Sequence, residues 1–391
     1  MTVQAAPRST VDIFSEEVFD NPYPHYKDLR DTASVVYLEK LDAYAISRYD
    51  DVMAALKDWQ TFGSTEGTSF NSVMNSNLEG VILTMEPPEH KGLRTTLLQR
   101  LRLSSVKELA GWVNEKAESM ITPLIERGQF DIVTDLAYPF PSQVVGELIG
   151  LRPDTTDQFV IGSDAVFAAM GPMNERTETA LGIIGEVLQI ISQLNEDDLA
   201  PGSMGAALYQ AAARGDIPEE SIVKLLWNYA GPAFDTTIQG INNVLWLLAT
   251  HPDQLELLRE DPSLIPSACY EALRVEPPIQ IWSRFCREDT TVGDQVVPAN
   301  SRVAVLLGSA NRDERHYDEP EKFDVRRNPK DLLSFGYGIH TCVGAALARL
   351  ELEAVLKAFV PKVRTIEVRD AVRHLNNTVR GFRNLPVVVN N

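Results

Sequence analysis

One stretch decides the fold of this 391-residue chain: Phe335-Gly336-Tyr337-Gly338-Ile339-His340-Thr341-Cys342-Val343-Gly344-Ala345-Ala346-Leu347-Ala348-Arg349. Cys342 follows a glycine-rich turn, and the closely spaced Ala and Leu residues of 343–360 predict a helix. A cysteine at the start of a helix meets free N–H groups and the positive end of the helix dipole, so we expect a lowered pKa and a thiolate. Gly336 and Gly338 permit φ > 0 in a tight turn, and Gly344 permits the close approach of a flat group.

Cys342 offers a single thiolate, with no second Cys or His at metal-ligand spacing. Tetrahedral zinc needs four ligands, whereas haem iron needs one axial ligand beside its macrocycle. The alternative is a structural cysteine packed beside a glycine turn. The whole stretch resembles the haem-binding loop of cytochromes P450, Phe-Gly-x-Gly-x-His-x-Cys-x-Gly-x-x-Leu-Ala-Arg, and fills each fixed position. The resemblance implies that Cys342 is the iron ligand and that the loop residues Phe335, Gly336, His340 and Gly344 bind the cofactor.

Composition limits the partners and the compartment. The chain is 44% hydrophobic and 23% charged, as in soluble globular proteins, and its net charge of −19 disfavours nucleic acid and anionic membranes as partners. Residues 1–8 have no apolar core, and no run of about 18 apolar residues occurs, so we expect a cytoplasmic protein. Three cysteines are too few for a disulfide framework. We expect one domain over 1–391, with 1–20 loosely ordered.

Short elements alternate with loops along the chain. Residues 35–38 and 43–46 predict a β-hairpin, because they are β-branched and aromatic. Residues 62–83, rich in Gly, Ser, Thr and Asn, predict a long loop with one short helix. The C-terminal residues 385–389 predict a strand, and Pro386 indicates an edge position.

A long helix is predicted from a capping box at Asp216 and Glu219 to Thr250, before His251-Pro252. Its residues are apolar nearly all round, which indicates burial. Pro232 removes a hydrogen bond and should kink the helix just before the acid and the hydroxyl of Asp235 and Thr236. The alternative is a helix-bending threonine beside a capped aspartate.

Three further motifs extend the resemblance to nearly the whole chain. Ala233-Phe234-Asp235-Thr236 resembles the oxygen-activating segment of the P450 I-helix, with Ala233 at the glycine position, although Ala230-Gly231 lies two residues early. The resemblance implies that Asp235 and Thr236 are catalytic and relay protons. It also implies propionate contacts from His90 and Arg94, four apart on one helix face, and from Arg284 on the strand-like residues 279–284, together with His340. It implies a structural triad under the haem, made by Glu271, Arg274 and Arg327.

The resemblance implies a mainly α fold with a minor β part, haem b (iron protoporphyrin IX) and O2 as co-substrate. The chain shows no flavin or nicotinamide motif, so NAD(P)H would act through a separate ferredoxin or flavodoxin and its reductase. A monomer is expected. Basic residues near Cys342 form a candidate dock for the acidic partner or else a scattered solvated surface: Lys322, Arg326, Arg327, Lys330 and Arg349.

The chain is also similar to soluble bacterial P450s that oxidise small aromatic acids such as para-substituted benzoates. Candidate pocket residues are apolar and predict a small hydrophobic or aromatic substrate: Phe70, Val81, Phe167, Ala233, Phe234, Ile281 and Val379. Glu66 in the long loop would repel a carboxylate, so we expect a neutral aromatic compound, hydroxylated or O-dealkylated.

Three rival functions remain open from the sequence. A peroxide-driven peroxygenase would keep the haem but usually lacks the acid–alcohol pair. A non-catalytic haem-thiolate sensor or carrier would leave Asp235 without a task. A hydrolase with Cys342 as nucleophile has no partner base at a suggestive position.

Overall fold

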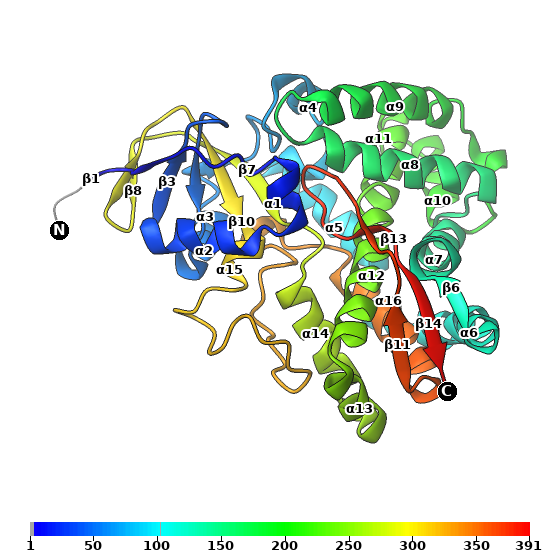
Figure 1. Cartoon of the computed structure of the whole chain (residues 1–391). Coiled ribbons are helices and arrows are strands. Elements are labelled where there is room, and N and C mark those ends of the chain that lie inside the picture. The colour runs from blue at the N-terminus through cyan, green and yellow to red at the C-terminus, as the bar shows by residue number, and fades with distance from the viewer. Residues whose placement is uncertain (1–3, 102) are drawn as a thin grey trace.

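Helices form most of the computed structural model, which describes residues 4–101 and 103–391, and the strands gather mainly at one side (Figure 1). The predicted fold class, mainly α with a minor β part, is confirmed. The α-helices are α1 Glu16–Asp20, α2 Tyr23–Thr32, α3 Tyr49–Lys57, α4 Ser72–Asn77, α5 Glu89–Leu101, α6 Leu103–Arg127, α7 Pro139–Ile149, α8 Pro153–Ala169, α9 Glu175–Ile191, α10 Met204–Ala213, α11 Ile222–Ala230, α12 Asp235–Thr250, α13 Pro252–Glu260, α14 Ile265–Val275, α15 Leu307–Ala310 and α16 Ala345–Phe359.

The largest sheet has six strands in the order β2-β3-β4-β10-β7-β5. The predicted hairpin of β3 and β4 is confirmed, with Val35 opposite Ile46. The short helix predicted in the long loop is α4. The strands are β1 Gln4–Ala5, β2 Arg8–Ser9, β3 Val35–Leu38, β4 Ala43–Ile46, β5 Phe62–Gly63, β6 Gln129–Asp131, β7 Ile281–Cys286, β8 Thr290–Val292, β9 Gln295–Val297, β10 Ser301–Leu306, β11 Thr365–Val368, β12 Val372–Arg373, β13 Phe382–Asn384 and β14 Pro386–Asn390.

The two ends of the chain differ from their sequence-based description. The edge position predicted for the C-terminal strand is wrong, because β14 lies between β11 and β6. Pro386 is tolerated there because it is the first residue of the strand. Of the N-terminal segment expected to be loose, residues 1–3 lie outside the described residues, whereas β1 pairs with β9 and β2 with β3. The single-domain organisation stays a prediction.

The predicted long helix is divided by Gly231–Phe234 into α11 and α12, a sharper interruption than a kink. Pro232 has no N–H to continue the helical ladder. Ser163 of α8 satisfies backbone groups on both sides of the break, since its hydroxyl donates to the Gly231 carbonyl and accepts from the Asp235 N–H at 3.3 Å. The predicted capping box is wrong: Asp216 accepts from Arg214 instead, and a short 3-10 turn precedes α11.

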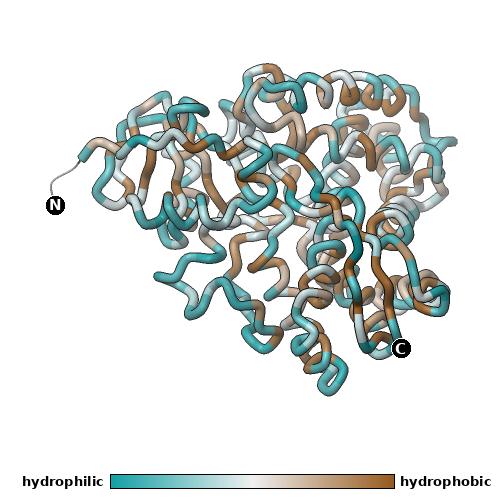
Figure 2. The backbone as a smooth tube through the Cα atoms, in the orientation of Figure 1, coloured by the Kyte–Doolittle hydropathy of each residue, from teal (hydrophilic) through white to brown (hydrophobic). Residues whose placement is uncertain are grey.

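Helix α12 crosses the centre of the molecule and is buried over most of its surface, as predicted (Figure 1). Its apolar side chains join one core cluster with those of α6, α14 and α16. Hydrophobic residues lie along the interior segments, while hydrophilic ones concentrate in the peripheral loops (Figure 2). Over residues 4–101 and 103–391, none of the helices combines the length and the hydropathy that a bilayer-spanning segment requires.

Candidate functional site

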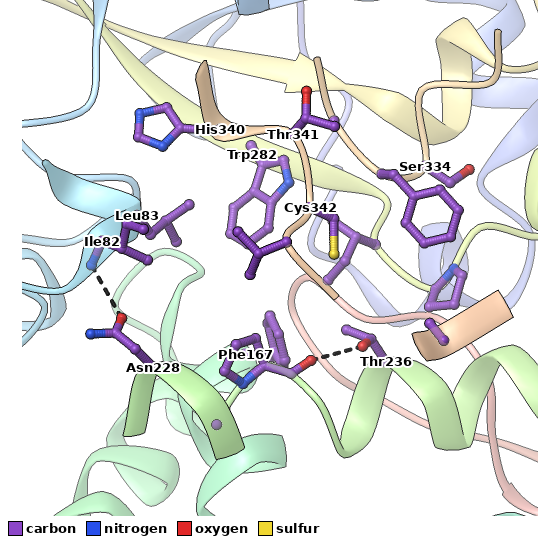
Figure 3. A pocket seen from close by; sticks show the side chains of 18 of the residues that line it. Ile82, Leu83, Phe167, Asn228, Thr236, Trp282, Ser334, His340, Thr341 and Cys342 are labelled. Atoms are coloured by element: carbon purple, nitrogen blue, oxygen red, sulfur yellow. Dashed lines mark hydrogen bonds between the residues drawn. The ribbon is translucent and has the colours of Figure 1, made fainter. Parts of the chain in front are cut away.

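A cavity with about 1510 Å³ of space, its open mouth included, lies beside the α11–α12 break and the loop that precedes α16. The sulfur of Cys342 points into it, toward Thr236 and Phe167 (Figure 3). Apolar and aromatic side chains form most of the wall, and charged or ionisable side chains contribute only a few positions. Such a cavity suits an apolar group with a few oriented polar contacts.

The Cys342 loop has the tight geometry that its glycines predict. Gly336 and Gly338 have φ of +68° and +72°, and a Cβ on Gly338 would lie 2.7 Å from the Leu56 carbonyl oxygen. The backbone N–H of Cys342 donates to the Phe335 carbonyl at 2.8 Å, which closes the turn. A Cβ at Gly344 would meet the Cys342 sulfur at 3.8 Å, and both residues line a smaller space that adjoins the cavity.

The lowered pKa expected for Cys342 is wrong for the protein alone. Desolvation by the surrounding wall raises the pKa of the thiol, although the side chain is exposed to the cavity, and the N–H groups of Gly344 and Ala345 and the charge of Arg94 act in the opposite direction. The helix start is therefore present, with α16 beginning at Ala345, but its favourable field is smaller than the cost of desolvating a thiolate. A bound cation is what would make the thiolate the stable form here.

Nitrogen-bearing side chains gather at one part of the cavity wall: His90, Arg94, Arg284 and His340. Their rings and guanidinium groups come from α5, β7 and the Cys342 loop, and the two histidine rings lie 4.9 Å apart. The Nε2 atoms of both histidines are buried without a hydrogen-bond partner in the described part of the chain. Arg284 is buried and donates only to the Ser283 carbonyl among the described contacts.

The charges of this group disfavour one another. Burial, then Arg284 and the neighbouring groups, lower the pKa of His340 to about 3. Burial also lowers the pKa of Arg284 to about 10 and lowers the pKa values of His90 and Arg94. Buried cations with unused donors are costly unless an anion meets them. The arrangement therefore fits a buried dianionic group such as a pair of propionates.

The side chains of Thr236 and Asp235 lie in different environments. Thr236 lines the cavity and its Oγ1 donates to the Pro232 carbonyl at 2.9 Å, as the dashed line in Figure 3 shows. Asp235 is only 3% exposed and does not line the cavity. Burial, then the charge of Asp164, raise the pKa of Asp235 to about 7, while His374 opposes this. Asp235 therefore exchanges a proton near neutral pH.

The predicted triad residues are brought together. Arg274 donates to both carboxylate oxygens of Glu271, at 2.7 and 2.8 Å, and Arg327 donates to the same carboxylate at 3.1 Å. Glu271 and Arg274 are completely buried. A buried carboxylate held by two guanidinium groups fixes the segments around 311–327 relative to α14.

The predicted pocket residues divide into two sets. Val81 and Phe167 line the cavity, and Ala233 lines an adjoining space that also reaches Cys342 and Thr236. The cavity wall does not include the four others: Phe70, Phe234, Ile281 and Val379. Phe234 is buried in the main core, Phe70 lines a separate surface pocket, and the remaining two line a third pocket.

The sequence analysis did not predict several of the residues that line the cavity. Trp282 lies on the cavity wall, whereas its neighbour Ile281 faces the opposite side of β7, since successive strand residues alternate. Asn228 on α11 also lines the wall, and its Oδ1 accepts from the Ile82 N–H at 3.2 Å (Figure 3). Glu351 of α16 lines the adjoining space, and burial raises its pKa well above the ordinary value. Alternation and helical spacing predict such faces only once the strand register is known.

Glu66 does not line the cavity. Both its oxygens accept from Arg287, at 2.8 and 2.9 Å, and it borders the separate surface pocket with Phe70. Glu66 is therefore not placed to repel a carboxylate inside the substrate cavity, contrary to the prediction from the sequence.

A lone cysteine sulfur, a broad apolar cavity and a set of unpaired buried donors together fit a haem group with a thiolate ligand. Comparison with known proteins agrees. The model of the cytochrome P450 family matches residues 143–367. The chain is 34% identical over 387 residues to cytochrome P450 CYP199A2 of Rhodopseudomonas palustris, covering 97% of this chain and 94% of the relative. It is 31% identical to the β-dihydromenaquinone-9 ω-hydroxylase of Mycobacterium bovis, covering 97% and 78%.

Solved structures show the same architecture. CalO2 superposes with a TM-score of 0.83 at 26% identity, over 97% of this chain and 99% of that one. The P450 CREJ, solved in complex with (4-ethylphenyl) dihydrogen phosphate, superposes with a TM-score of 0.82 at 28% identity, over 95% and 98%. The chain belongs to the cytochrome P450 family and is a P450 monooxygenase, an oxidoreductase. Membership implies haem, O2, a small-molecule substrate and redox partners.

Proposed function

We propose that this enzyme inserts one oxygen atom from O2 into a small hydrophobic, neutral aromatic substrate, by hydroxylation or O-dealkylation. The second oxygen atom leaves as water, which consumes two electrons and two protons. One observation carries the proposal: the Cys342 sulfur and the Thr236 hydroxyl face the same largely apolar cavity.

The cofactor in this proposal is haem b. Cys342 would ligate its iron, and His90, Arg94, Arg284 and His340 would hold its propionates by hydrogen bonds, charge-assisted from the two arginines. The Nε2 atoms of both histidines have no described partner, whereas Arg94 already donates one N–H to the Thr341 carbonyl at 2.6 Å. Phe335 and Ala233 would contact the haem with their side chains, whereas Gly336 and Gly344, which have none, would leave room for it. When bound, the haem supplies the activation of O2, and the thiolate favours O–O cleavage.

Asp235 and Thr236 supply protons in this proposal. The carboxyl group of Asp235 holds a proton near neutral pH, because burial and Asp164 raise its pKa to about 7. Thr236 presents its hydroxyl to the cavity while it donates to the Pro232 carbonyl. The break between α11 and α12 frees the Pro232 carbonyl from the helical ladder, and this carbonyl holds the Thr236 hydroxyl at the cavity.

The substrate class rests on the cavity wall. Phe167, Trp282 and Val81 offer aromatic and aliphatic contacts suited to a flat ring. The cationic groups of the wall are Arg94 and Arg284, because the pKa values of the two histidines are lowered. Both arginines are assigned to the propionates, so no described cation of the wall remains for a substrate carboxylate. The lack of a free cation, and not the charge of Glu66, is therefore the reason to expect a neutral compound. The aryl ligand of CREJ, a relative of the same fold, is consistent with an aromatic substrate.

Electrons would come from NAD(P)H through a ferredoxin, or a flavodoxin, and its reductase. Lys322, Arg326 and Lys330 are exposed, although the first two pair with Glu319 and Asp324. The more buried Arg327 and Arg349 are engaged with Glu271 and Tyr270. We further propose a monomer in the cytoplasm, where the buried free thiols of Cys269 and Cys286 would stay reduced.

A matched substrate panel tests this function. Each para-substituted ring is offered as a neutral compound and as the corresponding benzoate, and binding is read from the haem spin-state shift. Product formation with a ferredoxin system and NAD(P)H is then measured. We expect the neutral member of each pair to bind more tightly and to be oxidised. Tight binding of the benzoates, or oxidation of none of the aromatics, would contradict the proposed substrate class.

A further inference from the structure

Three potential metal ligands from distant parts of the chain meet on the side of Asp235 away from the cavity wall. Asp164 lies on α8, Asp235 begins α12, and His374 follows β12. One ligand atom from each residue lies within 4.8 Å of the other two. Among the described residues, no other group of His, Cys, Asp and Glu side chains meets that geometry.

The hydrogen bonds of this cluster leave one buried oxygen unused. His374 Nε2 lies 2.6 Å from Asp164 Oδ1, which also accepts from Asn376 Nδ2 at 2.8 Å. Asp235 Oδ1 accepts from Gln239 at 3.3 Å. Asp235 Oδ2 is buried and has no partner in the part of the chain that the structure describes. A bare carboxylate oxygen beside a second carboxylate is costly to bury, so this oxygen needs either a proton or a cation.

We propose that Asp164, Asp235 and His374 bind a divalent transition-metal ion of the zinc type. One imidazole nitrogen and two carboxylate oxygens are ligands that zinc takes at about 2.0–2.2 Å, with water in the fourth position. Ligand atoms of such a tetrahedral site lie about 3.3 Å apart. Since the three atoms lie within 4.8 Å of one another, each pair must approach by at most about 1.5 Å to bind the ion. The ion replaces the proton shared by His374 and Asp164 and pairs with the bare Asp235 oxygen.

The site is partly exposed to solvent. The Asp164 side chain is 44% exposed and that of His374 is 19% exposed, whereas Asp235 provides the fixed inner ligand. Arg383 is a cation whose charge lowers the pKa of His374, so it also opposes the binding of a second cation. The two carboxylates together carry the charge that balances a divalent ion.

Binding of the ion has a consequence that rests on the proposed role of Asp235. A carboxylate held by a metal carries no proton and does not move toward Thr236, so the ion inhibits oxygenation. Binding itself does not depend on that role.

Calorimetric titration of zinc chloride into the untagged, haem-loaded enzyme tests the site. We expect one zinc ion per chain, with affinity reduced by more than about tenfold in Asp164→Asn and in His374→Ala. The matched control is His316→Ala, because His316 pairs with Asp331 at 2.7 Å without a third ligand among the described residues. Absence of zinc binding by the wild type, or equal affinity in His374→Ala, would overturn the proposal.

The inhibitory consequence is measured separately, as product formation at increasing zinc concentration with magnesium as the control ion. Zinc should inhibit the wild type and His316→Ala but not the residual activity of His374→Ala. Equal inhibition of all variants would overturn the link to Asp235. If no aromatic compound is oxidised even without zinc, the proposed function fails, and calorimetry still decides the site.

Discussion

Two clusters of charged side chains differ in how completely their hydrogen bonds are made. In the first, Arg274 donates to Glu271 through two nitrogens and to the carbonyls of Asn311, Pro320 and Lys322. A guanidinium group has five N–H donors, so none remains unused. In the second, made by Asp164, Asp235 and His374, one buried carboxylate oxygen has no described partner.

This difference in hydrogen bonding suggests that the first cluster serves stability and the second serves function. A closed network fixes backbone segments and gains nothing from a further ligand. An open cluster keeps a group whose pKa is displaced to about 7, as for Asp235, and it can exchange a proton or accept an ion. Breaking the closed network should therefore unfold the protein, whereas altering the open cluster should change activity and leave the fold intact.

Arg274→Met should have the largest effect, because it leaves the buried Glu271 carboxylate with only Arg327 as a charged partner. We expect a loss of about 3–5 kcal/mol in the free energy of unfolding and poor haem retention. Denaturant unfolding and the haem content of the purified protein measure this. A variant as stable as the wild type would contradict the closed-network interpretation.

Asp235→Asn should show the opposite pattern. Removal of the exchangeable proton should lower the rate of product formation by about 100-fold, while Tm and haem content stay close to wild type. Steady-state turnover with a ferredoxin system and thermal melting are the two measurements. Full activity in this variant would show that Asp235 carries no proton for the reaction.

Arg327→Met should have a smaller effect on stability than Arg274→Met. Arg327 is 19% exposed and is the second guanidinium on Glu271, so its loss leaves the main pair intact. We expect a cost of about 1 kcal/mol in the free energy of unfolding. If both variants lose equal stability, the triad acts as one inseparable unit.

Glu351→Gln should have the smallest effect on stability. The effect should be seen as a change in how Tm depends on pH. Burial raises the Glu351 pKa well above 4.5, so the folded state holds the proton more tightly than the unfolded state. The contribution of this group is therefore complete at low pH and is lost as pH rises. We expect Tm to fall less between about pH 5 and about pH 8 in the variant than in the wild type. Identical slopes would contradict a protonated Glu351.

The sequence predicted the parts whose chemistry is local. The glycine turns before Cys342, the start of α16 and the pairing of Glu271 with Arg274 follow from short spacings, and all occur. The family and the fold class followed from these motifs and are confirmed.

The parts that failed depend on tertiary packing. Strand pairing decides which face of β7 meets the cavity. The sequence predicts Ile281 as a lining residue, whereas Trp282 lines the cavity in the structure. The pKa of Cys342 depends on burial, and the open cluster joins Asp235 to Asp164 and His374 from distant segments. No local pattern marks such contacts, and the roles assigned to the site residues stay predictions.

The central claim is that the Cys342 thiolate ligates haem iron, and the carbon-monoxide spectrum of the reduced protein tests it most directly. We expect the wild type to give the long-wavelength carbonyl band of cytochromes P450, and Cys342→Ser to lose both that band and the oxygenation activity. A wild-type protein that takes up no haem, or a serine variant with an unchanged band, would contradict the account.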